Sequence, residues 1–345
     1  MTTHSRRDMM KYGLAAGLAA GTMGLPCLSN AASTYTGVTY MPPSYTALMW
    51  GIDGFNKRLN EGMGDAGKAE FYDSATLLKA DEQIAGLRSR SIDYMFHTST
   101  YISRSFKAVG LLGLPSLVGE LYENGDRISR GTPLFNLMRD HLRQDNIEML
   151  SLGGGVIEPQ YVWSAKEPIT SLEQLRGRKV RVVGYEASTA LESIGVVPVR
   201  IPSSETYLAL QRGTVDAAVA NISTVIARNL QEQLKYVYKL PITAYTIGLY
   251  MRADRYQNLD PVAREAFDNA TAWYDANSAD QVNNVLYKRD HWPKIDEAGI
   301  ETVEPDQAAR EQFTEISKEV WEWWKDQAGR EFGEKAIALA RGESA

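Results

Sequence analysis

The chain has 345 residues, a formal net charge of −6 at pH 7, and 44% hydrophobic residues. This length allows one large or two medium domains with hydrophobic cores. An acidic balance without a basic cluster excludes the electrostatic footprint of a nucleic-acid partner. After residue 32, no run reaches the roughly 18 consecutive apolar residues that a membrane-spanning helix needs.

The N-terminal segment has the features of an export signal. Residues 5–11, SRRDMMK, resemble the twin-arginine motif S-R-R-x-F-L-K, and an Ala- and Gly-rich apolar stretch follows. We therefore predict that residues 1–32 are a twin-arginine signal peptide, cleaved near Ala31 or Ala32, and that the mature protein is periplasmic. The single cysteine, Cys27, lies inside this segment, and Pro26 before it does not fit a lipid-attachment site.

Strands and helices alternate at the start of the mature chain. The predicted elements are a strand, a helix, a strand, a helix and a strand: Thr36–Met41, Ala47–Leu59, Ala69–Tyr72, Lys79–Arg90 and Ile92–Phe96. This alternation favours crossover units on a mainly parallel sheet. A strand at Ile147–Leu152 then leads into Gly153-Gly154-Gly155. No helix follows this triplet, so we predict a flexible crossover between two lobes rather than a phosphate site.

The stretch 172–225 is the most informative part of the sequence. It predicts three strands separated by two helices: 179–184, 187–194, 197–201, 207–212 and 215–219. In such sheets ligands bind beyond the carboxyl ends of the strands, and Arg181 stands near that end of its strand. An ionised guanidinium is costly to bury unpaired. Arg181 is therefore either paired with an acidic residue or faces a wet crevice that receives an anion, which its planar fork would bind.

The C-terminal part predicts one crossing strand and two long helices. Thr246–Met251 would return to the first lobe, and a helix at Pro261–Lys288 and another at Asp306–Gln327 would follow. A small, charged tail is expected at 331–345. The final helix carries three tryptophans, Trp321, Trp323 and Trp324, which we do not expect to face one core. A monomer is favoured, and a homodimer through this helix is the alternative.

A spaced pattern in this chain resembles a known family. The run LEQLRGRKVRVVG…SSETYLALQRGTVDAA is similar to the signature region of the extracytoplasmic solute receptors of TRAP transporters, in which D-L-x-G-x-K-x-R-V leads into E-x-Y-x-A-L-Q-x-G-x-V-D. The matching positions are Leu175, Gly177, Lys179, Arg181, Val182, Glu205, Tyr207, Ala209, Leu210, Gln211, Gly213, Val215 and Asp216. In the family, the arginine at the Arg181 position holds the carboxylate of the ligand. The resemblance implies the same role here.

The resemblance also implies a fold and a function. The fold would be an α/β, two-lobed periplasmic binding protein fold, type II-like, with an interlobe cleft and a long connecting helix. Lobe 1 would comprise 33–160 plus 247–280, and lobe 2 would comprise 161–246 plus 281–330. The protein would bind a small organic acid and deliver it to the TRAP membrane permease. A sensor that feeds a signalling partner is the alternative.

Several further residues are candidate ligand contacts. Gln160 and Lys166 lie at the start of lobe 2, where the family offers a polar or basic contact, although Lys166 is equally suited to the surface. Tyr185 follows the Arg181 strand and offers a flat apolar face and a hydroxyl. Asn221 either contacts the ligand or caps a helix that starts near Ser223. The remaining candidates are Ser203, where a small residue leaves room for ligand, together with Tyr40, Tyr101 and His97 from lobe 1.

The sequence offers little support for an enzyme or a metal site. The four histidines are scattered, and no pair has the spacing of metal ligands. The segment expected to form the mature protein has no thiol nucleophile. The family branch that binds a cation with its ligand has an acidic residue near position 219, where this chain has Val219. We therefore expect no catalysis, no metal and no cofactor. The sequence does not identify the acid.

Overall fold

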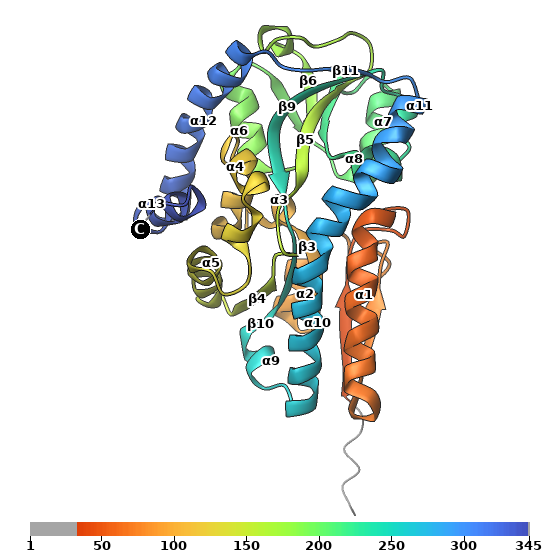
Figure 1. Ribbon diagram of the computed structural model, residues 1–345, viewed down its shortest axis with the longest axis vertical. Helices are drawn as coiled ribbons and strands as arrows, with labels where there is room; N and C mark the ends of the chain where they lie inside the picture. The colour runs from red at the N-terminus through yellow and green to blue at the C-terminus, as the bar shows by residue number, and fades with distance from the viewer. Residues whose placement is uncertain (1–32, 344–345) are drawn as a thin grey trace, which may run out of the picture. The chain divides into compact units, whose positions relative to one another are not determined.

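The computed structural model describes residues 33–343 (Figure 1). The predicted signal peptide lies outside this range. The chain forms two mixed sheets. The five-stranded sheet has the order β2-β1-β3-β10-β4 and consists of β1 (Ser33–Val38), β2 (Gly67–Tyr72), β3 (Tyr94–Thr98), β4 (Ile147–Ser151) and β10 (Ile247–Arg252). In this sheet β1 pairs in parallel with β2 and β3, whereas β10 is antiparallel to β3 and β4.

The six-stranded sheet has the order β11-β9-β5-β8-β6-β7. Its strands are β5 (Ile157–Ser164), β6 (Lys179–Val182), β7 (Val197–Arg200), β8 (Ala217–Ala220), β9 (Tyr236–Tyr245) and β11 (Glu301–Val303). The three strands predicted around Arg181 are β6, β7 and β8, and β6 pairs in parallel with both others. Two features differ from the sequence prediction: β9 was not foreseen, and β5 begins earlier than residue 161.

Helices surround both sheets. They are α1 (Thr46–Met63), α2 (Gln83–Ser89), α3 (Ser99–Ile102), α4 (Leu117–Glu123), α5 (Pro133–Arg143), α6 (Tyr185–Ser193), α7 (Thr206–Gln211), α8 (Ile222–Ala227), α9 (Ala253–Gln257), α10 (Pro261–Asp280), α11 (Trp292–Glu297), α12 (Gln307–Ala328) and α13 (Arg330–Ala340). Short 3-10 turns occupy η1 (Gly64–Ala66), η2 (Lys107–Gly113), η3 (Gly125–Ile128), η4 (Glu173–Leu175), η5 (Ser203–Glu205) and η6 (Leu230–Glu232). Within residues 33–343, no helix is both long and apolar enough to cross a bilayer.

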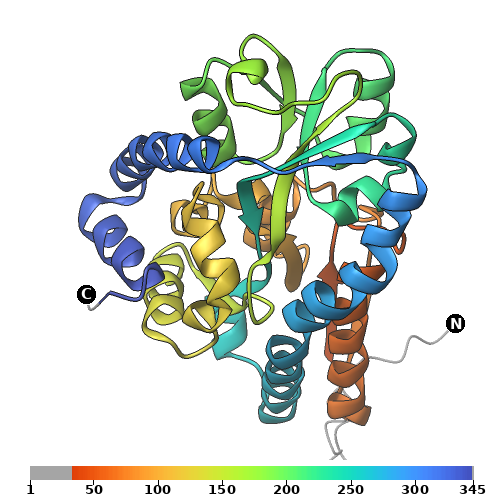
Figure 2. The same cartoon turned by 45° about the horizontal axis from the view of Figure 1, so that its top comes forward.

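The long helix after β10 changes its geometry part of the way along. Asp260 caps α10 by accepting a hydrogen bond from the Ala263 amide at 2.9 Å, and Pro261 occupies the first turn. The α-helix ends at Asp280, and an eleven-residue π-helix, η7 (Gln281–His291), continues it into α11. The π-helix is rare in proteins, and where it does occur it often lies at a functional site. Helix α10 packs along α1, as Figure 2 shows. The π-helix η7 contacts β5, a strand of the six-stranded sheet, and also helix α8.

The glycine triplet joins the two sheets, but it is held firmly. Gly154 has a φ of +76°, and a Cβ atom there would collide with the main-chain oxygen of Asp275 on α10. The carbonyl oxygen of Gly153 accepts a hydrogen bond from the Ala279 amide at 3.0 Å, and the Ser151 hydroxyl donates to the Asp275 carboxylate. The crossover is therefore packed against α10 rather than loose.

Two expectations for the C-terminal part need correction. The segment expected as a charged tail contains α13, whose Ala336 and Ala340 are fully buried. The tryptophans of α12 do share one core: Trp324 is buried in it, and Trp321 and Trp323 pack against it. Trp321 and Trp324 are three residues apart, which places them on one side of the helix. The tryptophan cluster therefore gives no argument for a homodimer.

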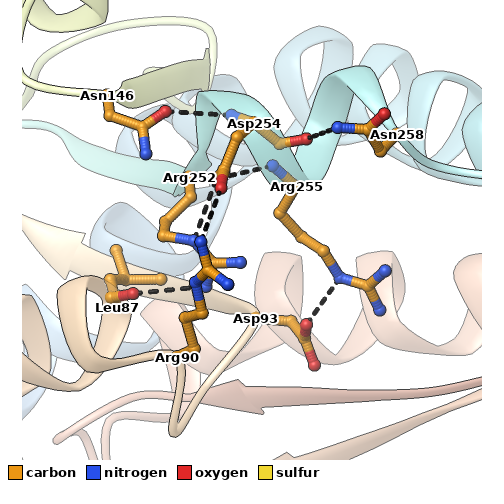
Figure 3. Close-up of polar contacts among 8 residues, drawn as sticks. All are labelled: Leu87, Arg90, Asp93, Asn146, Arg252, Asp254, Arg255 and Asn258. Carbon is orange, nitrogen blue, oxygen red and sulfur yellow. Dashed lines mark hydrogen bonds and ion pairs between the residues drawn. The ribbon is translucent and has the colours of Figure 1, made fainter.

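A polar network fastens α9 to the first sheet (Figure 3). Asp254 accepts hydrogen bonds from the Arg252 guanidinium at 2.9 Å and from the Arg255 amide at 2.8 Å. Arg255 in turn donates to Asp93 at 2.8 Å, and Asp93 also accepts from the Thr36 amide. Because each carboxylate binds main-chain amides as well as cations, the network fixes the chain just after β10 and just before β3.

Candidate functional site

A cavity of about 20 Å³ lies between the two sheets. Six of its lining residues precede β4 in the chain and six belong to the segment from β5 to β9. The lining consists of Tyr40, Tyr45, Leu48, Thr98, Thr100, Tyr101, Gln160, Arg181, Val183, Ser203, Thr224 and Tyr245. Several of these residues follow the carboxyl ends of the parallel strands β1, β3, β6 and β8, which is where α/β sheets bind ligands.

Arg181 is the charged group of this lining. Its side chain is 2% exposed, its Nε donates to the Ile201 carbonyl oxygen, and one Nη donates to the Val219 carbonyl oxygen, both at 2.9 Å. Within residues 33–343 no carboxylate lies within ion-pair distance of it. Burial lowers the pKa of Arg181, but a guanidinium remains charged in proteins. Of the two alternatives left by the sequence, the structure shows the unpaired one: the guanidinium lines a cavity.

Two aromatic side chains of the first lobe form one wall. The hydroxyls of Tyr40 and Thr98 are hydrogen-bonded at 3.2 Å, and the ring centroids of Tyr40 and Tyr101 are 4.9 Å apart. His97 packs behind both rings and does not line the cavity. One ring nitrogen of His97 lies 2.8 Å from the Ala80 carbonyl oxygen, and burial lowers the pKa of His97 to about 4. His97 therefore supports the aromatic wall as a neutral side chain.

Two hydrogen bonds connect the lobes at the cavity. The Ser203 amide donates to the Tyr101 hydroxyl at 2.9 Å, and the Tyr45 hydroxyl donates to the Thr224 hydroxyl at 3.5 Å. Tyr45 and Tyr101 flank the first sheet, whereas Ser203 and Thr224 follow β7 and β8. These contacts form only when the lobes are together, so the structure represents a closed arrangement.

Gln160 enters the cavity because its strand is irregular. The pairing of β5 with β9 shifts register on both sides of Gln160. Such irregularities re-aim side chains at functional sites. The side chain is 5% exposed and lines the cavity. Gln160 and Arg181 therefore line the same cavity from neighbouring parts of the second sheet.

Asn221 lies outside the cavity lining, because its amide is used inside the fold. Its oxygen accepts from the Ser223 amide at 2.9 Å and from the Tyr287 hydroxyl at 2.7 Å, and its nitrogen donates to the Glu158 carbonyl oxygen at 2.7 Å. Of the two roles proposed for Asn221, the structure favours the cap of α8.

Two other candidates are also placed away from the cavity. Lys166 is exposed in the turn after β5, where its ammonium is hydrated. Tyr185 begins α6, and its ring lies close to three cations: the guanidinium of Arg200 is 4.7 Å from the ring centroid, the guanidinium of Arg104 is 5.5 Å away and the ammonium of Lys107 is 5.7 Å away. Tyr185 is thus held by surface cations rather than offered to a ligand.

Several lining residues were not singled out as contacts from the sequence. They are Leu48, Thr98, Thr100, Val183, Thr224 and Tyr245. Position gave a usable signal for some of them, since Thr98 ends β3 and Val183 follows β6. Tyr245 gave no such signal because β9 itself was not predicted.

The cavity opens toward a wider hollow of about 740 Å³. The two share Tyr40, Tyr101, Val183 and Ser203, so the hydrogen bond between Tyr101 and Ser203 lies at their boundary. Among the described residues, five charged side chains line the hollow, namely Lys79, Asp81, Arg200, Glu205 and Arg228. We call this hollow the cleft mouth.

Two α/β lobes that close over one buried, unpaired cation define a receptor for a small anion. Residues 39–327 match the bacterial extracellular solute-binding proteins, family 7, also called DctP. The chain belongs to this family, the extracytoplasmic solute-binding proteins of TRAP transporters, as the sequence pattern indicated.

Known relatives agree with this assignment. The chain is 20% identical over 299 residues to the C4-dicarboxylate-binding periplasmic protein DctP of Shewanella loihica, covering 82% of this chain and 83% of the relative. It is 23% identical over 261 residues to the 2,3-diketo-L-gulonate-binding periplasmic protein YiaO of Escherichia coli, covering 72% and 74%. The match to a solute-binding protein of Albidiferax ferrireducens, at 25% identity, covers 49% of this chain and only 48% of that relative.

Solved structures confirm the two-lobed fold. DctP7, a Bordetella pertussis extracytoplasmic solute receptor binding pyroglutamic acid, superposes with a TM-score of 0.80 at 18% identity, covering 90% of this chain and all of that one. A TRAP solute-binding protein of Sulfitobacter sp. NAS-14.1 with bound β-D-galacturonate gives a TM-score of 0.76 at 21% identity, covering 89% and 99%.

Proposed function

We propose that this protein is a periplasmic receptor that binds the carboxylate of a small organic acid at Arg181 and delivers it to a TRAP membrane permease. The observation that carries this proposal is the buried guanidinium of Arg181, which lines an interlobe cavity without a carboxylate partner among residues 33–343. The names of related receptors, which bind pyroglutamate, galacturonate or C4-dicarboxylates, support an acid as the ligand.

Burial makes this pair selective for the closed state. In an open cleft both ions are hydrated and their attraction is screened by water, whereas closure removes water and strengthens the attraction between guanidinium and carboxylate. A ligand can favour closure only through its higher affinity for the closed state. The acid therefore supplies the charge that the closed cavity lacks, and the closed receptor is the form that docks on the permease.

Substitution of Arg181 tests the proposal. A thermal-shift screen of organic acids first identifies a ligand of the mature protein, and calorimetry then compares the wild type with Arg181→Ala. Loss of one partner of a buried charge pair costs about 2–5 kcal/mol, which corresponds to a roughly 30- to several-thousand-fold weaker affinity.

Lys166→Ala is the control for this experiment, because it removes an exposed cation on the same lobe and should leave the affinity unchanged. An Arg181→Ala affinity within threefold of the wild type would contradict the proposal. Recovery of the acid unchanged after incubation, measured by NMR, would agree with a receptor and not with an enzyme.

We further propose export through the twin-arginine pathway. The SRRDMMK motif at residues 5–11 supports it. Replacement of Arg6 and Arg7 together by lysine should leave the protein in the cytoplasm, which cell fractionation and immunoblotting would detect. Periplasmic protein in normal amounts would refute this route.

A further inference from the structure

We propose that Arg200 and Arg228 at the cleft mouth capture the incoming acid before the lobes close and thereby set its association rate. This inference rests on the proposed function, because it assumes that the acid passes through the cleft to Arg181. It divides binding between two groups of cations. The two mouth arginines govern how fast the acid arrives, and Arg181 governs how long it stays.

The closed structure requires a capture step that precedes contact with Arg181. The cavity around this buried arginine has about 20 Å³, which is room for one water molecule and for no organic acid. The lobes must therefore separate before an acid reaches Arg181. The cleft mouth, which lies outside the hydrogen bond between Tyr101 and Ser203, is the part of the cleft that an approaching acid meets first.

The charge of the whole chain works against the arrival of an anion. The formal net charge is −6, and the predicted signal peptide, residues 1–32, carries the cations Arg6, Arg7 and Lys11 against the single acid Asp8. The predicted mature chain is therefore still more negative. A protein of this charge slows the approach of an anion unless cations at the entrance attract it locally.

Arg228 supplies one such cation. It is the C-cap of α8, and it lines the cleft mouth. Its guanidinium lies 5.3 Å from the ring centroid of Tyr45, which also lines the inner cavity. Within residues 33–343, the buried Nε of Arg228 has no hydrogen-bond partner, and no carboxylate lies within ion-pair distance of the guanidinium. Arg228 thus offers a charge and an unsatisfied donor beside the route from the mouth to the cavity.

Arg200 supplies the other cation. It ends β7, is exposed, and lines the cleft mouth, where its Nε donates to the Val183 carbonyl oxygen at 3.0 Å. Two cations from the segment after α3, Arg104 and Lys107, share the ring of Tyr185 with it. In the described part of the chain, none of these three cations has a carboxylate within ion-pair distance. The charge of Arg200 is therefore reinforced by its neighbours and not neutralised.

The acids of the mouth do not cancel these charges. Among the described residues that line it, Asp81 and Glu205 stand against Lys79 and the two arginines. The mouth keeps a positive excess, to which the cations around Tyr185 add. At an ionic strength of 0.1 M, interactions between exposed charges more than about 10 Å apart are largely screened. An acid at the entrance therefore senses the mouth cations more strongly than the net charge of the chain.

The salt dependence of association gives the first test, because its sign differs between attraction and repulsion. The thermal-shift screen supplies the acid, and stopped-flow fluorescence measures its association with the mature protein in NaCl at about 50 and about 500 mM. Capture by the mouth cations predicts association at least about threefold slower at the higher concentration, because salt screens the attraction. An association rate that stays the same or rises with salt would overturn the inference.

Charge substitutions assign the effect to the two arginines. Arg200→Gln combined with Arg228→Gln should slow association at least about fivefold at the lower salt concentration and change dissociation less than about twofold. Arg200→Lys combined with Arg228→Lys keeps both charges and should bring the association rate back to within about twofold of the wild type. An unchanged association rate in the glutamine variant, or a change confined to dissociation, would contradict capture.

Arg176→Gln combined with Arg212→Gln is the matched control. Both arginines are exposed on the same lobe, near the amino ends of β6 and β8, and neither lines the cleft mouth. This variant removes the same charge at the edge of the sheet opposite the cleft, so both rates should stay within about twofold of the wild type. Melting temperatures monitored by circular dichroism establish that each variant folds.

The two proposals fail in different ways. If Arg181→Ala weakens binding as predicted and the Arg200→Gln, Arg228→Gln variant associates at the wild-type rate, the capture step is wrong and the proposed function stands. If Arg181→Ala keeps the wild-type affinity, the proposed function is wrong whatever the mouth variants do.

Discussion

Glu186 is a carboxyl group buried outside the binding cavity. It is 3% exposed on α6, accepts a hydrogen bond from the Ser103 hydroxyl at 3.0 Å, and faces Lys107, Arg200 and Trp324. Burial raises the pKa of Glu186 from the usual 4.5 to about 7 despite these partners. The folded state therefore prefers the protonated form. The stabilisation from this group is complete below pH 4.5 and is lost as the pH rises through 7.

Glu186→Gln should remove this pH dependence, because glutamine stays neutral and still accepts from Ser103. The free energy of unfolding of the variant relative to the wild type should rise between pH 4.5 and pH 8 by on the order of 2–3 kcal/mol. Urea unfolding at several pH values measures this difference. Glu192→Gln, an exposed position on the same helix, is the control. A difference that does not vary with pH would show that Glu186 is not the titrating group.

Asn221 should matter for stability and not for ligand binding. Asn221→Ala removes the cap of α8 and leaves the Tyr287 hydroxyl and the Glu158 carbonyl oxygen without this partner. We expect a loss of about 2–4 kcal/mol in the free energy of unfolding, measured by urea denaturation. The affinity for the identified acid, measured below the melting temperature, should change less than threefold. A selective loss of affinity would instead place Asn221 in the site.

For single residues, the sequence singled out part of the cavity lining, and ligand binding by these residues stays a prediction. Arg181 stood out because a charge in an apolar strand demands an explanation, and Tyr40, Tyr101, Gln160 and Ser203 follow strands or lobe junctions. The sequence could not decide between a ligand contact and a structural role for a polar side chain such as Asn221. That choice depends on partners distant in the chain, here Tyr287 and Glu158.

At the scale of the elements, the crossover from β4 to β5 requires a residue without a side chain at position 154, and substitutions can test this requirement. Gly154→Ala would bring a methyl group onto the Asp275 carbonyl oxygen, in addition to forcing alanine into a left-handed conformation at φ +76°. Gly213 has a similar φ of +66° with nothing within 4 Å of an added Cβ. Gly213→Ala should therefore cost about 1–2 kcal/mol for conformation alone, whereas Gly154→Ala should cost about 3–5 kcal/mol.

Urea unfolding of both variants measures this difference. Equal losses of stability would mean that the backbone conformation, and not the contact with α10, limits the residue at 154. A larger loss for Gly154→Ala would show that the packing of the crossover on α10 holds the two sheets in register with the long helix.

Elements with a strong local pattern were predicted, and those that depend on distant contacts were not. Strands β6, β7 and β8 are short runs rich in valine or alanine, and helix α12 has buried residues at three- and four-residue steps. Strand β9 mixes tyrosine, lysine and proline, and it becomes a strand because β5 pairs along it. The π-helix η7 also has no signature in a window of residues, since its geometry follows from packing against both lobes.

For the whole molecule, the hydrogen bond between Tyr101 and Ser203 should slow the release of ligand. Tyr101→Phe keeps the ring contacts with Tyr40 and His97 but removes the hydroxyl that accepts from Ser203 across the lobes. A single hydrogen bond contributes about 0.5–1.5 kcal/mol, so we expect dissociation of the bound acid to accelerate about two- to tenfold. Stopped-flow displacement measures this rate.

Tyr207→Phe is the control, because the Tyr207 hydroxyl contacts Glu232 and Gln233 within the second lobe. An unchanged rate in Tyr101→Phe would mean that closure does not depend on this bond.

Within residues 33–343, the hydrogen bonds that position Arg181 go to the main-chain oxygens of Ile201 and Val219. Substitutions of the side chains that line the cavity can therefore change the ligand without moving Arg181, because the main chain holds its guanidinium. This property suits the protein to biosensor engineering: the lining residues could be varied in libraries to bind new acids, while Arg181 keeps its position.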